Sequence, residues 1–340
     1  MSQVQTMHGA IDSSRLGRVL VHEHIFLSDP EYIANYRPDF DEDRVVDDAV
    51  AELDALKALG IDTIIDLTVL GLGRDVPRIA RVAERTSLQI VVATGVYSFD
   101  KVPEAFAYWG PGLLHHIDED PMIGLFVKDI TEGIAGTSFR AGALKCAIDK
   151  PGLTPGVERI MRAVAKAHVR TGAPISVHTA PAERTGLDAQ RVFAEEGVDL
   201  RDVIIGHSGD SIDLDYLMEL ADQGSILGMD RFGIEFHTTT PQRVATIVEM
   251  VRRGYADRLA LSHDCACWAY YLPTDQLRRD LMPEHRFTHV CNAVIPALLE
   301  QGVSQRDIDT MFIDNPRRHF EGAAERFAVR KSIAGEHLHV

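Results

Sequence analysis

The stretch Val19-Leu20-Val21-His22-Glu23-His24 is an apolar run that ends in two histidines separated by one residue. Continuous, β-branched hydrophobicity of this kind is typical of a strand covered on both faces, as in a parallel sheet. Because side chains alternate along a strand, His22 and His24 point to the same side. Two neutral imidazoles placed in this way can begin a metal site, whereas the short motif alone is more often a pair of ordinary histidines at a strand end.

Runs of the same type recur along the chain and predict eight strands: residues 18–24, 61–68, 88–94, 141–148, 174–178, 203–207, 225–230 and 258–263. Amphipathic stretches between most of them, several ended by glycine, predict helices over residues 43–59, 76–85, 155–170, 211–223 and 241–253. Strands and helices that alternate in this way predict an α/β fold, the (β/α)₈ TIM barrel. Since no linker interrupts the pattern, we expect residues 1–340 to form a single domain.

The composition excludes several classes of partner. A formal net charge of -16 argues against nucleic acid and anionic membranes, which require clustered basic residues. The 4 cysteines are too few and too irregularly spaced for a disulfide framework, and Cys265 and Cys267 are interpreted as free thiols in preference to a metal or redox motif. No signal sequence and no membrane-spanning run is apparent, so the expected location is the cytoplasm.

The first, fourth, fifth, sixth and eighth predicted strands would each aim a potential metal ligand at the mouth where a parallel barrel keeps its active site. These ligands are His22, His24, Lys145, His178, His207 and Asp264. Imidazoles and a carboxylate suit zinc, and also manganese, cobalt or iron. Taken singly, a strand-end histidine is usually a hydrogen-bonded core residue and an aspartate after a strand is usually a helix cap. The convergence of all six weakens these single-residue interpretations and favours a metal site at the C-terminal mouth of the barrel.

Lys145 lies inside the apolar run 141–148. An ammonium group in a barrel interior must pair, lose its proton or be modified. The alternative is a side chain that extends outward to solvent.

Together these motifs resemble the phosphotriesterase family of the amidohydrolase superfamily, from Gly9 to Asp314-Asn315-Pro316. The quoted segments are His22-Glu23-His24, strand-borne Lys145, Ile175-Ser176-Val177-His178-Thr179, Ile205-Gly206-His207-Ser208-Gly209-Asp210 and Ser262-His263-Asp264. The resemblance implies two divalent metal ions, with zinc expected first and cobalt, manganese or iron as alternatives. It assigns His22, His24 and Asp264 to the more buried ion and His178 and His207 to the more exposed one. Lys145, carboxylated by carbon dioxide, would bridge both. A bridging hydroxide would then be the nucleophile, and Asp264 would accept the proton.

Two positions bear on the substrate class. Tyr97 and Arg231 resemble the tyrosine and arginine of the phosphotriesterase-like lactonase branch, where the organophosphate hydrolases proper carry tryptophan and histidine. The resemblance implies a quorum-quenching type of lactonase that opens N-acyl-homoserine lactones or other γ/δ-lactones, with weak promiscuous phosphotriesterase activity. The residues themselves leave structural roles open as alternatives. Tyr97 could serve only in packing, and Arg231 could form a structural ion pair with Asp210 or Asp230.

Other residues extend the predicted site. Asp210 resembles the outer carboxylate of a proton path from Asp264, although Arg231 replaces the histidine of that path. The segment 265–285 carries Trp268 and Tyr271, which either line an apolar channel for an acyl chain or pack on the barrel rim. The resemblance also implies a homodimer, with Trp268 as a candidate contact, and a small-molecule lactone as partner.

Three alternative functions remain open at this stage. They are a dedicated aryldialkyl phosphate hydrolase, an amide or carbohydrate-lactone hydrolase on the same scaffold, and a non-catalytic metal-dependent binding protein.

Overall fold

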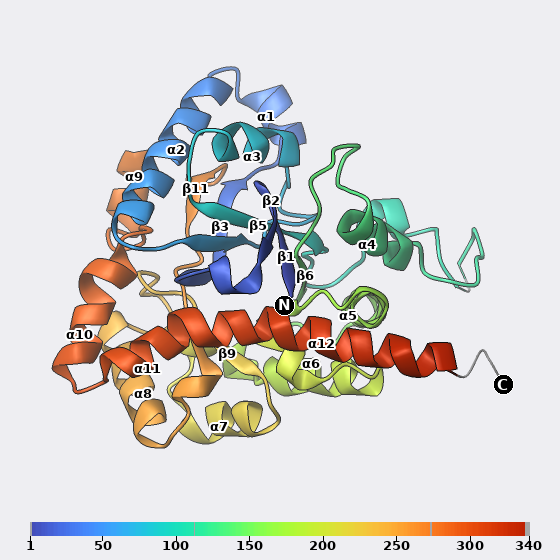
Figure 1. The fold of residues 1–340 in the computed structure, drawn as a ribbon. Coiled ribbons are helices and arrows are strands. Elements are labelled where there is room, and N and C mark those ends of the chain that lie inside the picture. Colours follow the sequence, from blue (N-terminus) through green and yellow to red (C-terminus); the bar gives the residue numbers. More distant parts are fainter. Residues whose placement is uncertain (1, 112, 273, 337–340) are drawn as a thin grey trace.

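The computed structural model describes residues 2–111, 113–272 and 274–336, and shows a curved sheet surrounded by helices (Figure 1). The strands are β1 Gln3–Thr6, β2 Gly9–Asp12, β3 Val19–Leu27, β4 Thr63–Asp66, β5 Gln89–Gly95, β6 Ala143–Ile148, β7 Ile175–Thr179, β8 Val203–Gly206, β9 Ile226–Met229, β10 Leu259–Leu261 and β11 Ala266–Ala269. The α-helices are α1 Pro30–Tyr36, α2 Glu42–Ala58, α3 Val76–Ala83, α4 Pro121–Thr131, α5 Pro155–Thr171, α6 Thr185–Glu195, α7 Leu214–Asp222, α8 Thr240–Arg252, α9 Asp275–Leu281, α10 Ile295–Glu300, α11 Gln305–Asp309 and α12 Asn315–Glu336. All eight predicted strands are present, as β3 to β10.

The main sheet is parallel throughout and runs in the order β10-β9-β8-β7-β6-β5-β4-β3-β11. β10 and β11 belong to one stretch of chain and pair with opposite edges of the sheet, β9 and β3. Between them, the Asp264 amide donates to the His22 carbonyl at 3.1 Å, and the His24 amide donates to the Cys265 carbonyl at 2.8 Å. The eighth position of the barrel is therefore completed by two short strands, and the predicted (β/α)₈ barrel is confirmed.

Helix α5 illustrates how the sequence sets the outer layer. The Thr154 side chain accepts a hydrogen bond from the Val157 amide, Pro155 occupies the first turn, and Gly172 ends the helix with a φ of 73°. These are preferred residues for a helix start and a left-handed C-terminal cap. The prediction of residues 155–170 differs from the observed helix by one residue.

The apolar core forms two layers, one on each side of the sheet. The outer layer packs strand residues such as Ile64 and Ile90 against the helices. The inner layer fills the barrel with residues such as Ile65 and Val91. Continuous hydrophobicity along the strands is explained by this arrangement, because both faces of each strand are covered.

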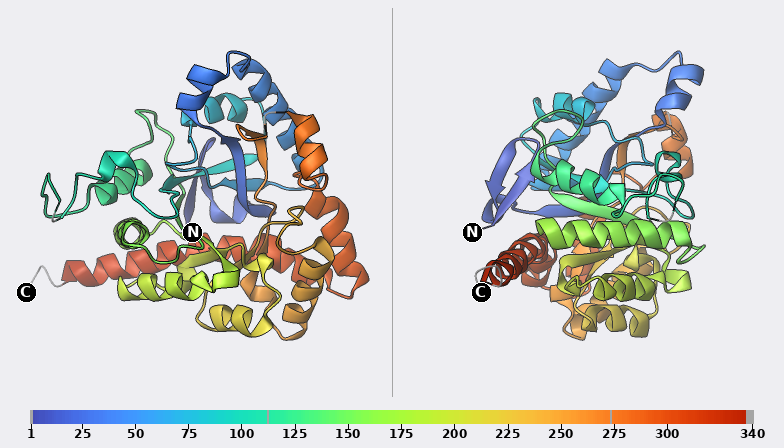
Figure 2. Two further views of the ribbon diagram at one scale, coloured as in Figure 1. Left: turned by 180° about the vertical axis from the view of Figure 1, so that it is seen from behind. Right: turned by 90° about the vertical axis from the view of Figure 1, so that its right-hand side faces the viewer.

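Two parts of the structure at the N-terminal end of the barrel were not predicted from sequence. The antiparallel hairpin β1–β2 contributes Val4 and Ile11 to the inner layer, and α12 contributes Phe320. In Figure 2 this hairpin and α12 lie beside one another at the end of the molecule that holds the N-terminus. Together they close the N-terminal end of the barrel and leave the opposite end for the site.

Within the described ranges, none of the helices combines the length and the apolar character needed to cross a membrane. The four cysteines are free thiols, and three of them, Cys146, Cys265 and Cys267, are buried.

Candidate metal centre

A cavity of about 940 Å³ opens at the carboxyl ends of the barrel strands. Its lining includes five of the six predicted ligands and three predicted substrate residues: His22, His24, Lys145, His178, Asp264, Tyr97, Arg231 and Tyr271. The sixth ligand, His207, is fully buried directly behind His178, with which it makes ring contact. The structure therefore brings all six predicted ligands to one place.

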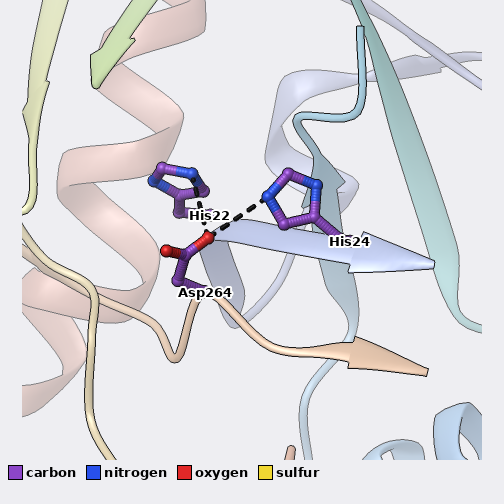
Figure 3. A group of neighbouring side chains, drawn as sticks. All are labelled: His22, His24 and Asp264. Atoms are coloured by element: carbon purple, nitrogen blue, oxygen red, sulfur yellow. Dashed lines mark ion pairs between the residues drawn. The ribbon is translucent and has the colours of Figure 1, made fainter. Parts of the chain in front are cut away.

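Three of these side chains converge on one point (Figure 3). Asp264 Oδ1 lies 3.5 Å from His22 Nε2 and 3.2 Å from His24 Nε2. One ligand atom from each residue lies within 4.8 Å of the others, so a single cation could bind all three.

The outer nitrogens of both histidines are held by hydrogen bonds that fix their protonation. His22 Nδ1 lies 2.8 Å from Asp230 Oδ2, and the carboxylate can only accept. His24 Nδ1 lies 2.8 Å from Thr68 Oγ1, whose own proton goes to Asp66. Both rings must donate through Nδ1, which leaves the Nε2 lone pairs facing Asp264 and free to bind a metal.

His178 and His207 are arranged in a way that is energetically unfavourable unless a cation is bound. His178 Nε2 donates to Asp149 Oδ2 at 2.5 Å, and His207 Nδ1 donates to Asp230 Oδ1 at 3.0 Å. The remaining nitrogens, His178 Nδ1 and His207 Nε2, lie 2.8 Å apart with a lone pair on each. Burial lowers the pKa of His178 to about 4, so the ring is neutral near pH 7. A bound cation would relieve the repulsion of the two lone pairs, and these residues therefore fit a metal.

Lys145 lies between the two groups and is 1% exposed. Its Nζ donates to His22 Nε2 at 3.2 Å, and in the described part of the chain no carboxylate forms an ion pair with it. Burial lowers its pKa to about 8. The outward-reaching alternative is wrong, since the amine lies inside the barrel.

The backbone at two ligands is strained. His207 and Asp264 adopt φ angles of 65° and 57°, a left-handed conformation that is uncommon for residues other than glycine. At Asp264 the strain is held by Glu23, which is fully buried on the opposite side of β3 from His22 and His24. Its carboxylate accepts hydrogen bonds from the Ser262 hydroxyl, from the amide and ring of His263, and from the Cys265 amide. Glu23 thus fixes the residues on both sides of Asp264.

Replacing Glu23 with glutamine is expected to destabilise the protein by about 2–4 kcal/mol, because a buried amide group must oppose one of these donors. The measurement is the urea midpoint of unfolding. Glu42→Gln, on a half-exposed carboxylate paired with Arg81, is the matched control and should cost less than about 1 kcal/mol. Equal midpoints for the two variants would show that Glu23 does not brace the loop.

The predicted substrate residues Tyr97 and Arg231 border the ligands. The Tyr97 ring lies 5.3 Å from the His178 ring. Arg231 Nε donates to Asp264 Oδ2 at 3.1 Å, and its terminal nitrogen donates to Asp210 Oδ2 at 2.9 Å. The sequence left open an ion pair of Arg231 with Asp210 or Asp230, and the structure shows the pair with Asp210. It also shows an ion pair with Asp264 that was not expected.

The structure places Tyr271 at the cavity but sends Trp268 elsewhere. Trp268 belongs to β11, opposite Phe26 of β3, and its ring meets Phe40 at 5.1 Å. It lines a separate hollow beside α2 and α9. The segment 265–285 is therefore not one open loop. The prediction that Trp268 lines the substrate channel is wrong, because its ring lies outside the cavity. Its role at a dimer contact stays a prediction.

Three carboxylates that orient the ligands were not predicted to do so from sequence: Glu23, Asp149 and Asp230. Asp230 links His22 to His207, and Asp149 holds His178. One signal was available for Asp149 and Asp230, because each lies at or just after the end of a predicted strand.

A parallel barrel with buried imidazoles, a lysine and a carboxylate at its C-terminal mouth defines a class of proteins, the metal-dependent hydrolases of the TIM-barrel type. Comparison with known proteins gives the particular family. Residues 2–320 match the phosphotriesterase family, so the chain belongs to it, within the amidohydrolase-like superfamily.

The relatives agree with this assignment. A "Phosphotriesterase homology protein" of Mycobacterium tuberculosis is 53% identical and covers 94% of this chain and 98% of its own. The solved structure titled as the phosphotriesterase of that organism, also 53% identical with the same coverage, superimposes with a TM-score of 0.91. An "Aryldialkylphosphatase" of Saccharolobus solfataricus is 36% identical over 92% of this chain and 97% of its own. Relatives named for an activity are hydrolases.

Proposed function

We propose that the protein is a binuclear metal-dependent lactonase that opens N-acyl-homoserine lactones or other γ/δ-lactones with an alkyl tail, and that hydrolyses phosphotriesters weakly. The observation that carries this proposal is the placement of Tyr97 and Arg231 beside His178 and Asp264. These are the positions at which the sequence resembles the lactonase branch.

His22, His24 and Asp264 would hold one metal ion, His178 and His207 a second, and carboxylated Lys145 would bridge them. Zinc suits this ligand set, and cobalt, manganese and iron are alternatives. When bound, such ions supply Lewis-acid polarisation of the substrate carbonyl and lower the pKa of water.

Tyr97 would act as a hydrogen-bond donor to the substrate. Burial raises the pKa of its hydroxyl above the usual value, so the group keeps its proton at neutral pH. A lactone ring oxygen departs as a poorly stabilised alkoxide, and a phenol placed next to it can donate to the developing charge.

Asp264 would accept the proton released in the reaction. Burial alone would raise its pKa, but the neighbouring His22 and His24 and the nearby Arg231 lower it well below the usual value. The carboxylate is therefore ionised at neutral pH and can accept a proton. Arg231 pairs with it on the side away from the two histidines, and Asp210 lies beyond Arg231.

The remaining cavity wall suits an apolar substituent. Its apolar lining residues come from four separate segments of the chain: Leu27, Leu70, Leu72, Ile234, Phe236, Leu272, Leu281 and Met282. A wall of this kind favours an alkyl tail over a charged one.

Aryldialkyl phosphate hydrolysis is the second candidate, and the name of the 36% identical relative favours it. A third activity, amide hydrolysis, has the support of a more distant relative, an "N-acetyltaurine hydrolase" of Dictyostelium discoideum that is 26% identical over 94% of this chain and 97% of its own.

The test compares wild type with Tyr97→Phe on a long-chain acyl-homoserine lactone and on a dialkyl aryl phosphate. We expect kcat/KM to fall about 10- to 100-fold for the lactone, and less than about 3-fold for the phosphate, because an aryloxide leaves without a proton donor. Tyr36→Phe is the control, since that exposed phenol lies outside the cavity lining. Equal losses on both substrates would contradict the role of Tyr97. Absence of turnover by metal-loaded wild type on the lactone, the phosphate and a panel of esters and N-acyl amides would favour a metal-dependent binding protein instead.

A further inference from the structure

Arg243 is a charged residue for which the site described so far has no use. It projects from α8, and its side chain is fully buried. One terminal nitrogen donates to Asp210 Oδ1 at 2.5 Å and the other to the Ile234 carbonyl at 2.8 Å. Arg243 does not line the cavity, so it cannot touch a substrate there.

These contacts place Arg243 at the outer end of a row of alternating charges. Asp210 uses one carboxylate oxygen for Arg243 and the other for Arg231, and Arg231 in turn donates to Asp264. The row runs from α8 to the metal ligand without a gap. Any rotation of the Asp210 carboxylate would pull Arg231 away from Asp264.

Arg243 also holds the segment that carries Arg231. The Ile234 amide bonds back to the Arg231 carbonyl, and the Thr238 hydroxyl bonds to the Asp210 carbonyl. Because Arg243 also donates to the Ile234 carbonyl, the segment 231–238 is fixed to Asp210 through both its backbone and its side chains.

We propose that Arg243 is a positioning residue for the hydrolytic reaction, which acts through Asp210 to keep the Arg231 guanidinium on Asp264. Stability alone explains it poorly. A buried ion pair is often no more stable than apolar side chains of the same volume, and the Nε of Arg243 has no partner among the described residues. The inference rests on the proposed hydrolase activity, but not on the preference for lactones.

The test is a double-mutant cycle of Arg243→Met and Arg231→Met, with kcat and KM measured on whichever of the lactone and the aryl phosphate is hydrolysed faster. In the wild-type background we expect Arg243→Met to lower kcat about 10- to 100-fold and to change KM less than about 3-fold. In the Arg231→Met background the same change should lower kcat by less than about 3-fold, because the residue through which Arg243 acts is already absent. A purely structural role would give the same loss in both backgrounds, and that result would overturn the proposal.

Two further variants complete the experiment. Arg243→Lys keeps a charge for Asp210 but cannot also reach Ile234, so its loss should be smaller than that of methionine and should follow the same pattern; it replaces Arg243→Met if that variant does not fold. Arg326→Met removes a guanidinium from buried Asp202, away from the cavity, and should leave kcat within about 2-fold.

The crystal structure of the Arg243 variant gives a readout that needs no turnover. The proposal predicts that Arg231 no longer contacts Asp264, and an unchanged contact would refute it. Failure of wild type to hydrolyse either substrate would count against the proposed function, while the structural result would still decide this inference.

Discussion

Replacing Asp264 with asparagine is expected to lower kcat/KM about 10²- to 10⁴-fold, the range associated with loss of a catalytic base, and to reduce metal content as well. The carboxylate is the point shared by His22 and His24 and also contacts Arg231. Asparagine is nearly the same shape and tolerates the φ of 57° at this position better than alanine would. The fold should therefore persist, and the loss will report on charge alone.

The measurement is kcat/KM at fixed metal concentration, together with metal content after dialysis. Asp43→Asn, on an 85% exposed side chain, is the control and should behave as wild type. Full activity of the Asp264 variant would mean that the proton acceptor lies elsewhere.

Replacing Lys145 with methionine is expected to lower activity about 10³-fold or more, because the site loses the ligand that would join its two metal ions. Stability of the metal-free protein should change in the opposite direction. A buried amine without a carboxylate partner is costly, and a side chain of similar length without charge removes that cost. The thermal midpoint of the metal-free variant should equal or exceed that of wild type.

Carboxylation of Lys145 predicts a further property of the wild-type protein. An N–C bond forms between Nζ and the carbon of carbon dioxide, and one proton is released, so only the neutral amine reacts. With a pKa of about 8, the neutral fraction rises with pH and levels off above that value. Reactivation of metal-free protein by zinc should accelerate with added bicarbonate and with pH up to about 8. Reactivation that is indifferent to bicarbonate, or a bare ammonium in the crystal structure of the metal-replete enzyme, would exclude the modification.

The positions of most metal ligands could be predicted from sequence because they lie at or near the end of an apolar run, and Lys145 is recognisable as a charged residue inside one. A strand end is visible as a loss of hydrophobicity, and a parallel barrel gathers all such ends at one mouth. His22, His178 and Asp264 come from strands far apart in the sequence, and closure of the sheet is what unites them.

The residues that orient these ligands were harder to predict from sequence, because their contacts depend on the register between neighbouring strands. Strand alternation alone places Glu23 opposite His22 and His24, but its contacts with Ser262 and the amides of His263 and Cys265 depend on where β3 lies against the segment after β10. Trp268 was placed wrongly for a related reason. The chain resumes pairing with β3 after Asp264, and this strand directs the indole toward Phe40 and not into the cavity.

The central claim is that this metal site serves lactones in preference to phosphotriesters. It is tested most directly by kcat/KM of zinc- or cobalt-loaded wild type, measured side by side on a long-chain acyl-homoserine lactone and a dialkyl aryl phosphate. We expect a ratio of at least about 10² in favour of the lactone, in keeping with the separation that one site can impose between two substrate classes. A ratio that favours the phosphate would leave the metal centre as described and would contradict the role assigned to Tyr97 and Arg231.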